Sequence, residues 1–271
     1  MQSLSRAALR PDRSGTPLPT VYQAFARHGI HLRTGEVSLL AAPPGNGKSS
    51  LALDWARKLG VPSLYFSADS DAWTQAQRLA AGTTGGLISD VELRMEVDEQ
   101  WAAEVLSSAS HLRWCFDSAP TLGDIELELA AYTEVMGRPP ELVVVDNLCD
   151  ITHSEGGEGN EYATWKAILK ELKWMARDSE ASWLVLHHTN EREERFDRQG
   201  ESKRRSKCPS RTDVSGKVSQ HPAMVLTMQL GETPGSLYVC PVKNRHGKAD
   251  PTGNDIAYLQ FWPEYMKIGD F

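Results

Sequence analysis

Short apolar runs alternate with longer amphipathic segments along most of the chain. Five runs have the composition of strands buried on both faces, at residues 37–41, 63–67, 112–116, 142–145 and 183–186. The clearest helical pattern has one apolar and one basic side, formed by Trp165, Ile168, Leu169, Leu172 and Met175 and by Lys166, Lys170, Lys173 and Arg177. Because strands that alternate with helices form right-handed crossovers, the pattern predicts an α/β fold with a twisted, mostly parallel sheet flanked by helices.

The pattern changes after residue 189. Residues 190–220 are dense in charged and small polar side chains and lack apolar periodicity, which predicts a long mobile loop. Strand-like runs return at 224–230, 237–242 and 256–261, so we expect an antiparallel, hairpin-rich C-terminal extension of the sheet. Residues 1–20 are polar, basic and interrupted by prolines, and are expected to form an arm or linker outside the core.

Composition narrows the class of protein. With 271 residues and 40% hydrophobic side chains, the chain is long and apolar enough for one large folded domain. Its formal charge, 29 − 36 = −7, means that any nucleic-acid binding must depend on a local basic patch. The four isolated cysteines indicate reduced thiols rather than a zinc site. No secretion signal or membrane-spanning run is visible, so we expect a soluble cytoplasmic protein without a membrane partner.

A phosphate-binding motif is the strongest chemical signal. Residues 42–49 read Ala-Pro-Pro-Gly-Asn-Gly-Lys-Ser between a predicted strand and a predicted helix, which is the context of a P-loop. Ala42 stands where the strict GxxxxGK[ST] pattern has its first glycine. Lys48 is expected to neutralise the β- and γ-phosphate oxygens of ATP, and the Ser49 hydroxyl to bind Mg²⁺. The expected nucleotide-binding residues are Pro44, Gly45, Asn46, Gly47, Lys48, Ser49 and Ser50.

Carboxylates follow two of the predicted strands at the sheet edge where ligands bind in open α/β folds. Asp146 ends one strand and is the expected second ligand of Mg²⁺. Asp69 follows another strand and is the candidate group that orients or activates water. Asp71 is explained more simply as a helix N-cap. Three aspartates at one edge also leave open a nuclease that uses metal ions.

With these segments in order, the chain resembles the RecA-like motor domain of the DnaB-like replicative hexameric helicases, from about residue 20 to residue 268. The resemblance implies a RecA-like P-loop NTPase fold, with residues 21–271 as the ATPase motor domain. Asp69 takes the place of the family's catalytic glutamate and is one methylene shorter. His188 takes the place of the glutamine that senses the γ-phosphate. Because only about 20 residues precede the motor, we expect a compact, phage-type version without the N-terminal collar and its primase partner.

A basic segment near the C-terminus extends the resemblance. Residues 242–247 are similar to the family's Lys-x-Arg-x-Gly segment, in which both cations reach the γ-phosphate of a neighbouring subunit. The resemblance therefore implies that Lys243 and Arg245 act in trans. It also implies a homo-oligomer, a hexameric ring by the family's rule, with nucleotide at the subunit interfaces.

A cluster of cations inside the predicted loop is the candidate DNA site. Its bases, which no acidic residue interrupts, are Lys203, Arg204, Arg205, Lys207 and Arg211. Such a cluster can bind the phosphates of single-stranded or forked DNA with little sequence preference. The preferred hypothesis is an ATP-dependent DNA translocase or helicase of replication or recombination, acting in the host cytoplasm if a phage encodes it. A RecA-like DNA-binding ATPase without unwinding and a metal-dependent nuclease remain alternatives.

Overall fold

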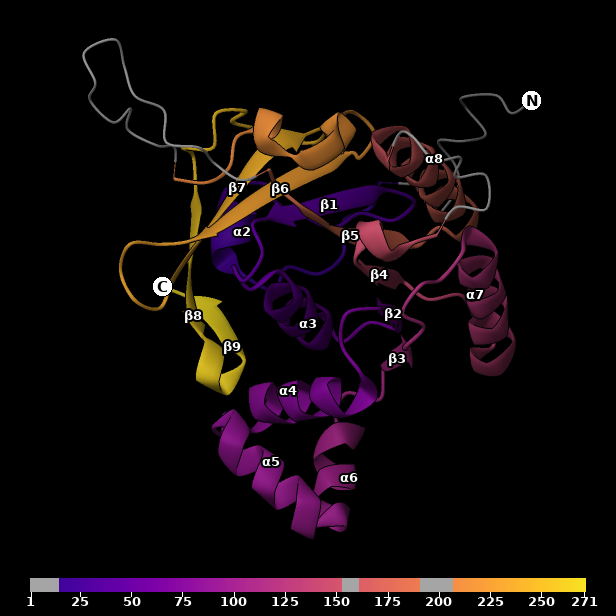
Figure 1. Cartoon of the computed structure of the whole chain (residues 1–271), viewed down its shortest axis with the longest axis vertical. Helices are drawn as coiled ribbons and strands as arrows, with labels where there is room; N and C mark the ends of the chain where they lie inside the picture. Colours follow the sequence, from indigo (N-terminus) through magenta and orange to yellow (C-terminus); the bar gives the residue numbers. More distant parts are fainter. Residues whose placement is uncertain (1–14, 153–160, 191–206) are drawn as a thin grey trace.

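The computed structural model describes residues 15–152, 161–190 and 207–271, and within these ranges nine strands form one sheet (Figure 1). The strands are β1 (Val37–Ala42), β2 (Ser63–Ser67), β3 (Leu112–Cys115), β4 (Leu142–Asp146), β5 (Ser182–His188), β6 (Met224–Leu230), β7 (Ser236–Asn244), β8 (Ala257–Trp262) and β9 (Lys267–Asp270). Their order across the sheet is β3, β2, β4, β5, β1, β6, β7, β8, β9. Pairing is parallel from β3 to β6 and antiparallel from β6 to β9, which confirms the predicted sheet and its extension.

Helices cover both faces of the sheet (Figure 1). They are α2 (Gln23–Arg27), α3 (Lys48–Leu59), α4 (Ala72–Thr84), α5 (Ile88–Val97), α6 (Glu99–Ser107), α7 (Leu122–Met136) and α8 (Glu161–Ser179). Residues of α2 to α6 belong to the core cluster on one face, and residues of α7 and α8 to the cluster on the other. In the described ranges, no helix has both the length and the apolar composition that crossing a bilayer requires.

The centre and the edge of the sheet differ in burial. All six residues of β1 are buried because β5 and β6 flank it and helices cover both of its faces. The same pattern was expected for β3, but this expectation is wrong. Arg113 is exposed and the next two residues are only half-buried, since β3 is the last strand on its side of the sheet.

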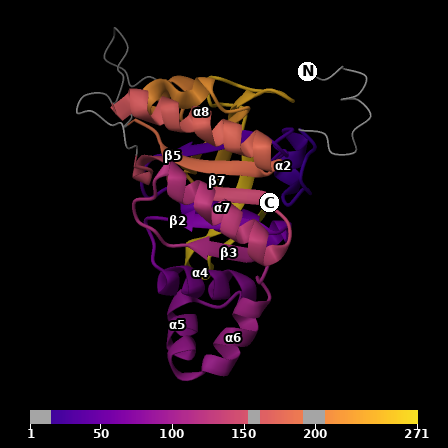
Figure 2. The same ribbon diagram turned by 90° about the vertical axis from the view of Figure 1, so that its right-hand side faces the viewer.

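Three helices between β2 and β3 form a projection at one end of the molecule (Figure 2). The Asp71 carboxylate accepts the backbone N–H of Thr74 at 2.9 Å and begins α4, as expected for an N-cap. The Thr74 hydroxyl bonds to it as well, at 3.0 Å, and these hydrogen bonds lower the pKa of Asp71. Capping therefore occupies this carboxylate.

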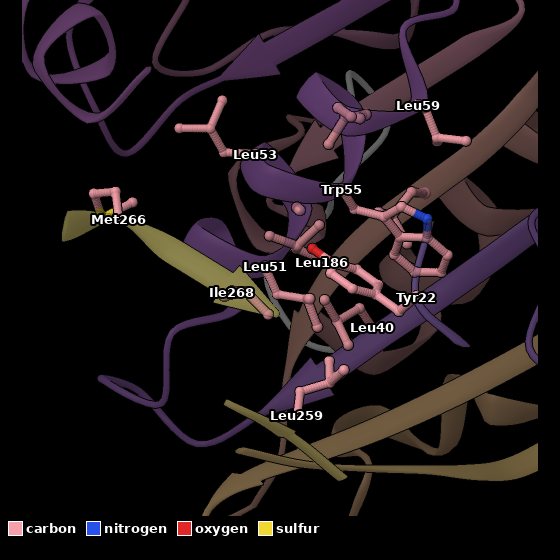
Figure 3. Packing of buried hydrophobic residues seen from close by; sticks show 14 of the residues in the cluster. Tyr22, Leu40, Leu51, Leu53, Trp55, Leu59, Leu186, Leu259, Met266 and Ile268 are labelled. Atoms are coloured by element: carbon pink, nitrogen blue, oxygen red, sulfur yellow. The ribbon is translucent and has the colours of Figure 1, made fainter. Parts of the chain in front are cut away.

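The segment before α2 packs against the domain. Leu18 is only 7% exposed and joins the core, so the expectation that residues 15–20 stay outside it is wrong. Tyr22 packs among Trp55 and Leu51 of α3 (Figure 3), and its hydroxyl donates to Asp54 at 2.5 Å. Residues 1–14 lie outside the described ranges, and the domain boundary near residue 20 remains a prediction.

The described part of the expected mobile loop, residues 207–220, is packed. It forms the 3-10 helices η2 (Arg211–Asp213) and η3 (Ser215–Gln220), and Val214 and Val218 are buried in the same cluster as Trp165 of α8. Gly216 has φ +66°, and a Cβ there would lie 2.7 Å from Trp165 Cε3. A mobile loop is therefore the wrong description here, because a few apolar residues without periodicity anchor the segment to α8.

Candidate nucleotide-binding site

The predicted P-loop connects β1 to α3 and is held in shape from a distant strand. Gly45 and Gly47 have φ of +74° and +81°, conformations that glycine adopts without strain. The Asn46 side-chain oxygen accepts the backbone N–H of Leu230 at 3.0 Å and the amide of Gln229 at 3.1 Å. The end of β6 thus fixes the turn between β1 and α3.

Lys48 lies at the start of α3 and is nearly buried, at 8% exposure. Its ammonium donates to the carbonyls of Ala42 at 3.3 Å and Pro43 at 3.5 Å. Burial lowers the pKa of Lys48, while the nearby carboxylates of Asp146 and Asp69 oppose this shift. A desolvated cation so placed binds an incoming phosphate more strongly than a solvated one would.

Asp146 ends β4 and is 4% exposed. It accepts hydrogen bonds from the Ser49 hydroxyl and from the Tyr65 hydroxyl, the latter at 3.2 Å. Burial raises the pKa of Asp146 to about 6, partly offset by these two donors. Ser49 and Asp146 therefore meet as the oxygen ligands predicted for Mg²⁺, and oxygen is the ligand this ion prefers.

Asp69 also faces this site. It lines the same cavity as Lys48 and Asp146, and its carboxylate accepts the side-chain N–H of Asn147 at 3.0 Å. Asp71 is absent from that lining because it caps α4. Among the described residues, no group of three or more His, Cys, Asp or Glu side chains could hold a metal ion. The three-aspartate cluster that suggested a nuclease is therefore not formed.

His188 ends β5 beside the P-loop, with its Nδ1 atom 3.4 Å from the Lys48 ammonium. Burial, and then the Lys48 charge, lower the pKa of His188, which favours the neutral imidazole. The preceding His187 is fully buried between Cys149, 3.5 Å from its Nδ1, and the Ser215 carbonyl, 3.2 Å from its Nε2. The end of β5 thus contacts the P-loop lysine through His188 and η3 through His187.

Several residues of the site were not predicted, because they come from elements that only the fold brings together. Tyr65 and Asn147 hold the two carboxylates, as described, and Gln229 holds the P-loop. Arg78 of α4 lines the cavity and donates to the Ser70 hydroxyl at 3.1 Å. An arginine about two helix turns after the N-cap Asp71 was the available signal for a phosphate or nucleotide contact.

The cavity has the size and chemistry that a nucleotide requires. Its volume is about 400 Å³, within the usual range for small-molecule sites. The described lining is Pro44, Gly45, Gly47, Lys48, Ser49, Ser50, Asp69, Ser70, Arg78, Asp146 and His188. All predicted site residues of the P-loop, the carboxylates and the sensor position except Asn46 thus meet here, and Asn46 supports them from outside the lining. Cationic and hydroxyl groups beside two carboxylates fit a magnesium-bound triphosphate.

Lys243 and Arg245 are the two remaining predicted catalytic residues. They lie at the opposite end of the parallel strands, where β1 begins. Asn244 pairs with Met224, which pairs with Ser38 at the start of β1, whereas the P-loop follows the end of β1. Because a strand rises about 3.3 Å per residue, β1 separates the two groups by about 20 Å. Neither cation can reach the nucleotide cavity of its own chain.

Both cations have partners within the chain. The Lys243 ammonium donates to the carbonyls of Gln220 at 2.7 Å and Pro222 at 2.6 Å. Burial, and then Arg211 and Arg245, lower the pKa of Lys243 to about 8. Arg245 lies 3.7 Å from the Glu36 carboxylate.

The candidate DNA-binding residues are only partly described. Lys203, Arg204 and Arg205 lie outside the described ranges. Lys207 is exposed, and Arg211 is half-buried in η2 near Lys243.

The fold and the site define a P-loop ATPase with a RecA-like fold. A family model described as an AAA domain matches residues 7–194, and the chain belongs to this family. The Gene 65 protein of Mycobacterium phage L5 is 34% identical to it over 264 residues, which are 95% of this chain and 94% of that protein.

Helicases are among the proteins similar to this chain. A probable plasmid replicative DNA helicase of Chlamydia muridarum is 26% identical over 93% of this chain, which spans 54% of that protein's length. The structure of a DnaB-like replicative helicase matches with a TM-score of 0.75 at 16% identity, over 96% of this chain and 63% of that one. The predicted resemblance to the motor domain of DnaB-like helicases is thereby confirmed.

Proposed function

We propose that this protein is an ATP-driven translocase or helicase that moves along single-stranded DNA in replication or recombination. One observation carries the proposal. The P-loop lysine, the Ser49–Asp146 pair and Asp69 meet in one cavity at one end of the parallel strands. The predicted trans-acting cations lie at the other end of these strands. That division suits a motor whose nucleotide is bound by one subunit and completed by the next.

Each residue of the cavity has a role in this proposal. Lys48 and the backbone N–H groups of the P-loop bind the phosphates of ATP, and Ser49 and Asp146 hold Mg²⁺, which neutralises charge on the phosphates. Asp69 lies beside this group and orients the attacking water through its carboxylate. The neutral His188 imidazole, close to Lys48, donates a hydrogen bond to the γ-phosphate or to that water.

The separation of Arg245 from the nucleotide cavity of its own chain supports an oligomer. If Arg245 completes the site of a neighbour, subunits must associate head to tail, which gives a closed ring or an open filament. A hexameric ring is the form proposed here. Electron microscopy of the protein with a non-hydrolysable ATP analogue and DNA tests it, because open filaments would favour the recombinase-like alternative.

Kinetics give the decisive experiment. ATP hydrolysis should be stimulated by single-stranded DNA in the wild type and abolished in Lys48→Ala. Arg245→Ala should lower kcat by about 10³-fold, the usual worth of a trans-acting arginine, while ATP binding persists. Wild-type hydrolysis by Arg245→Ala would contradict the trans-acting role, and strand displacement assays on forked DNA would separate a helicase from a translocase.

We assign DNA binding to the cluster of cations at residues 203–211. Replacing Lys203, Arg204, Arg205 and Lys207 together with glutamine should reduce the salt dependence of single-strand binding. About 0.7 counterions are released per phosphate contact, so the slope of log K against log salt should fall by about 3. A variant with Arg94, Arg113, Arg138 and Lys267 replaced by glutamine loses the same four charges at exposed positions and is the control for net charge. Equal slopes for wild type and quadruple variant would contradict the assignment.

A further inference from the structure

A second, small cavity lies beside Arg245, at the end of the strands opposite the P-loop. Its volume is about 40 Å³, which holds one or two oxygen-sized groups. The lining comes from the start of β1, from α8, and from the segments around β6 and β7. It consists of Gly35, Glu36, Val37, Lys173, Arg177, His221, Ala223 and Arg245.

Positive charge exceeds negative charge around this cavity. Glu36 is the one carboxylate in its described lining, and it already pairs with Arg245 at 3.7 Å and with His246 Nε2 at 2.9 Å. Within the described ranges, Lys173 and Arg177 form no ion pair. Burial, and then four surrounding lysines, lower the pKa of His221, which shows how closely the cations gather here. Such a cluster is complementary to an anion.

No described residue other than Glu36 contributes an anionic group to the lining of this cavity. The chain's own nucleotide cavity lies at the other end of the strands, about 20 Å away by the rise of β1. The cavity is continuous with Arg245, and Lys243 lies close enough to Lys173 and Arg245 for both to lower its pKa. One site therefore collects cations from α8 and β7.

We propose that Lys173 and Arg177 of α8, together with Arg245, bind the triphosphate of a nucleotide held in the P-loop of a second copy of this chain. The inference rests on the proposed function and adds α8 to its trans-acting site. The oxygen-sized cavity receives phosphate oxygens, and the three cations stabilise their charge.

Glu36 is the positioning residue of this site. Its side chain is 13% exposed. The residue immediately precedes β1, whose backbone pairs with β5 on one side and β6 on the other. By forming an ion pair with Arg245 and a hydrogen bond with His246 Nε2, it holds the end of β7 against the start of β1. Glu36→Gln should keep the acceptor but weaken the hold on Arg245, lowering kcat several-fold with KM for ATP unchanged.

Steady-state kinetics provide the first test. The full chain carrying Lys173→Ala and Arg177→Ala should lose at least about tenfold in kcat with single-stranded DNA present. The Arg94→Ala/Arg138→Ala variant removes the same number of charges at exposed positions outside the cavity; it is the matched control and should behave as wild type. Lys173→Arg with Arg177→Lys should recover most of the rate, because charge is retained, and unfolding curves should show that all variants fold.

A crosslinking experiment tests action in trans. One set of subunits carries Lys48→Ala and is labelled with ¹⁵N; it keeps Lys173 and Arg177 but lacks the P-loop lysine. These subunits are mixed with unlabelled Lys173→Ala/Arg177→Ala subunits, which keep Lys48. ATP with a photoreactive group on its γ-phosphate should then label the α8 peptide of the ¹⁵N-labelled chain. Labelling confined to unlabelled chains would overturn the inference.

The remaining outcomes distinguish the inference from the proposed function. If the Lys173→Ala/Arg177→Ala variant matches the Arg94→Ala/Arg138→Ala control while Arg245→Ala is impaired, the α8 cations have no part in the site and the inference fails alone. If the double variant loses single-strand binding without ATP but keeps its DNA-independent hydrolysis, the cavity binds the DNA backbone and the inference is again wrong. If wild type and Lys48→Ala hydrolyse ATP equally, the proposed function itself fails.

Discussion

The buried carboxylate of Asp146 destabilises the fold in the absence of ligand, although the proposed Mg²⁺ site requires it. Burial raises its pKa from 3.8 to about 6, and each pKa unit corresponds to about 1.4 kcal/mol. The folded protein thus favours the neutral form by about 3 kcal/mol relative to the unfolded chain. Because the side chain is only 4% exposed, solvent screening reduces this figure little.

The sign of the pH dependence follows from the direction of the shift. The folded state holds the proton more tightly, so the contribution of Asp146 to stability is greatest below pH 3.8, declines as the pH rises to about 6, and is constant above. Asp146→Asn is neutral at every pH and can still accept from Tyr65 and Ser49. It should exceed the wild type by about 3 kcal/mol at pH 7.5 and by about half of that at pH 5.

Urea unfolding without nucleotide and with EDTA measures this difference. Asp71→Asn is the control, since capping lowers the pKa of Asp71 and its replacement should give no gain. Adding ATP and Mg²⁺ at 100 times the wild-type Kd should stabilise the wild type by about 2.7 kcal/mol and Asp146→Asn by much less. Wild-type affinity should weaken as the pH falls through 6. A less stable Asp146→Asn in EDTA, or an equal gain with ligand, would refute the reasoning.

Three further predictions concern the P-loop and the N-terminal segment. Asn46→Ala removes the acceptor for Leu230 and Gln229 and should raise KM for ATP about fivefold, equivalent to one hydrogen bond of about 1 kcal/mol; an unchanged KM would show that this tether is dispensable. Gly47→Ala places a Cβ 3.0 Å from Phe261 at φ +81° and should cost about 1–2 kcal/mol of stability and weaken ATP binding, measured by thermal unfolding with and without ATP. Leu18→Ala should lower the free energy of unfolding by about 2–3 kcal/mol, and a wild-type value would mean that residues 15–20 are not packed on the domain.

Features that depend on neighbouring residues were determined by the sequence itself. The P-loop lies within eight residues, so its spacing alone specifies a turn, a lysine and a hydroxyl at the start of a helix. Asp146 and Asp69 could be placed at one sheet edge because each follows a buried run and parallel strands end on the same side. The apolar and basic sides of α8 were likewise fixed by its 3.6-residue period.

Contacts between distant segments were decided only by the tertiary structure. Residues 207–220 lack periodicity, yet Val214, Val218 and Gly216 pack on α8, because burial of single apolar residues depends on what the fold places against them. The same holds for Asn46, whose partners lie more than 180 residues away at the end of β6. Above all, the pairing of the strands puts Arg245, Lys173 and Arg177 at the end of the sheet opposite the P-loop. Neither residue types nor spacing can specify that separation, since it is set by which strands pair across the sheet.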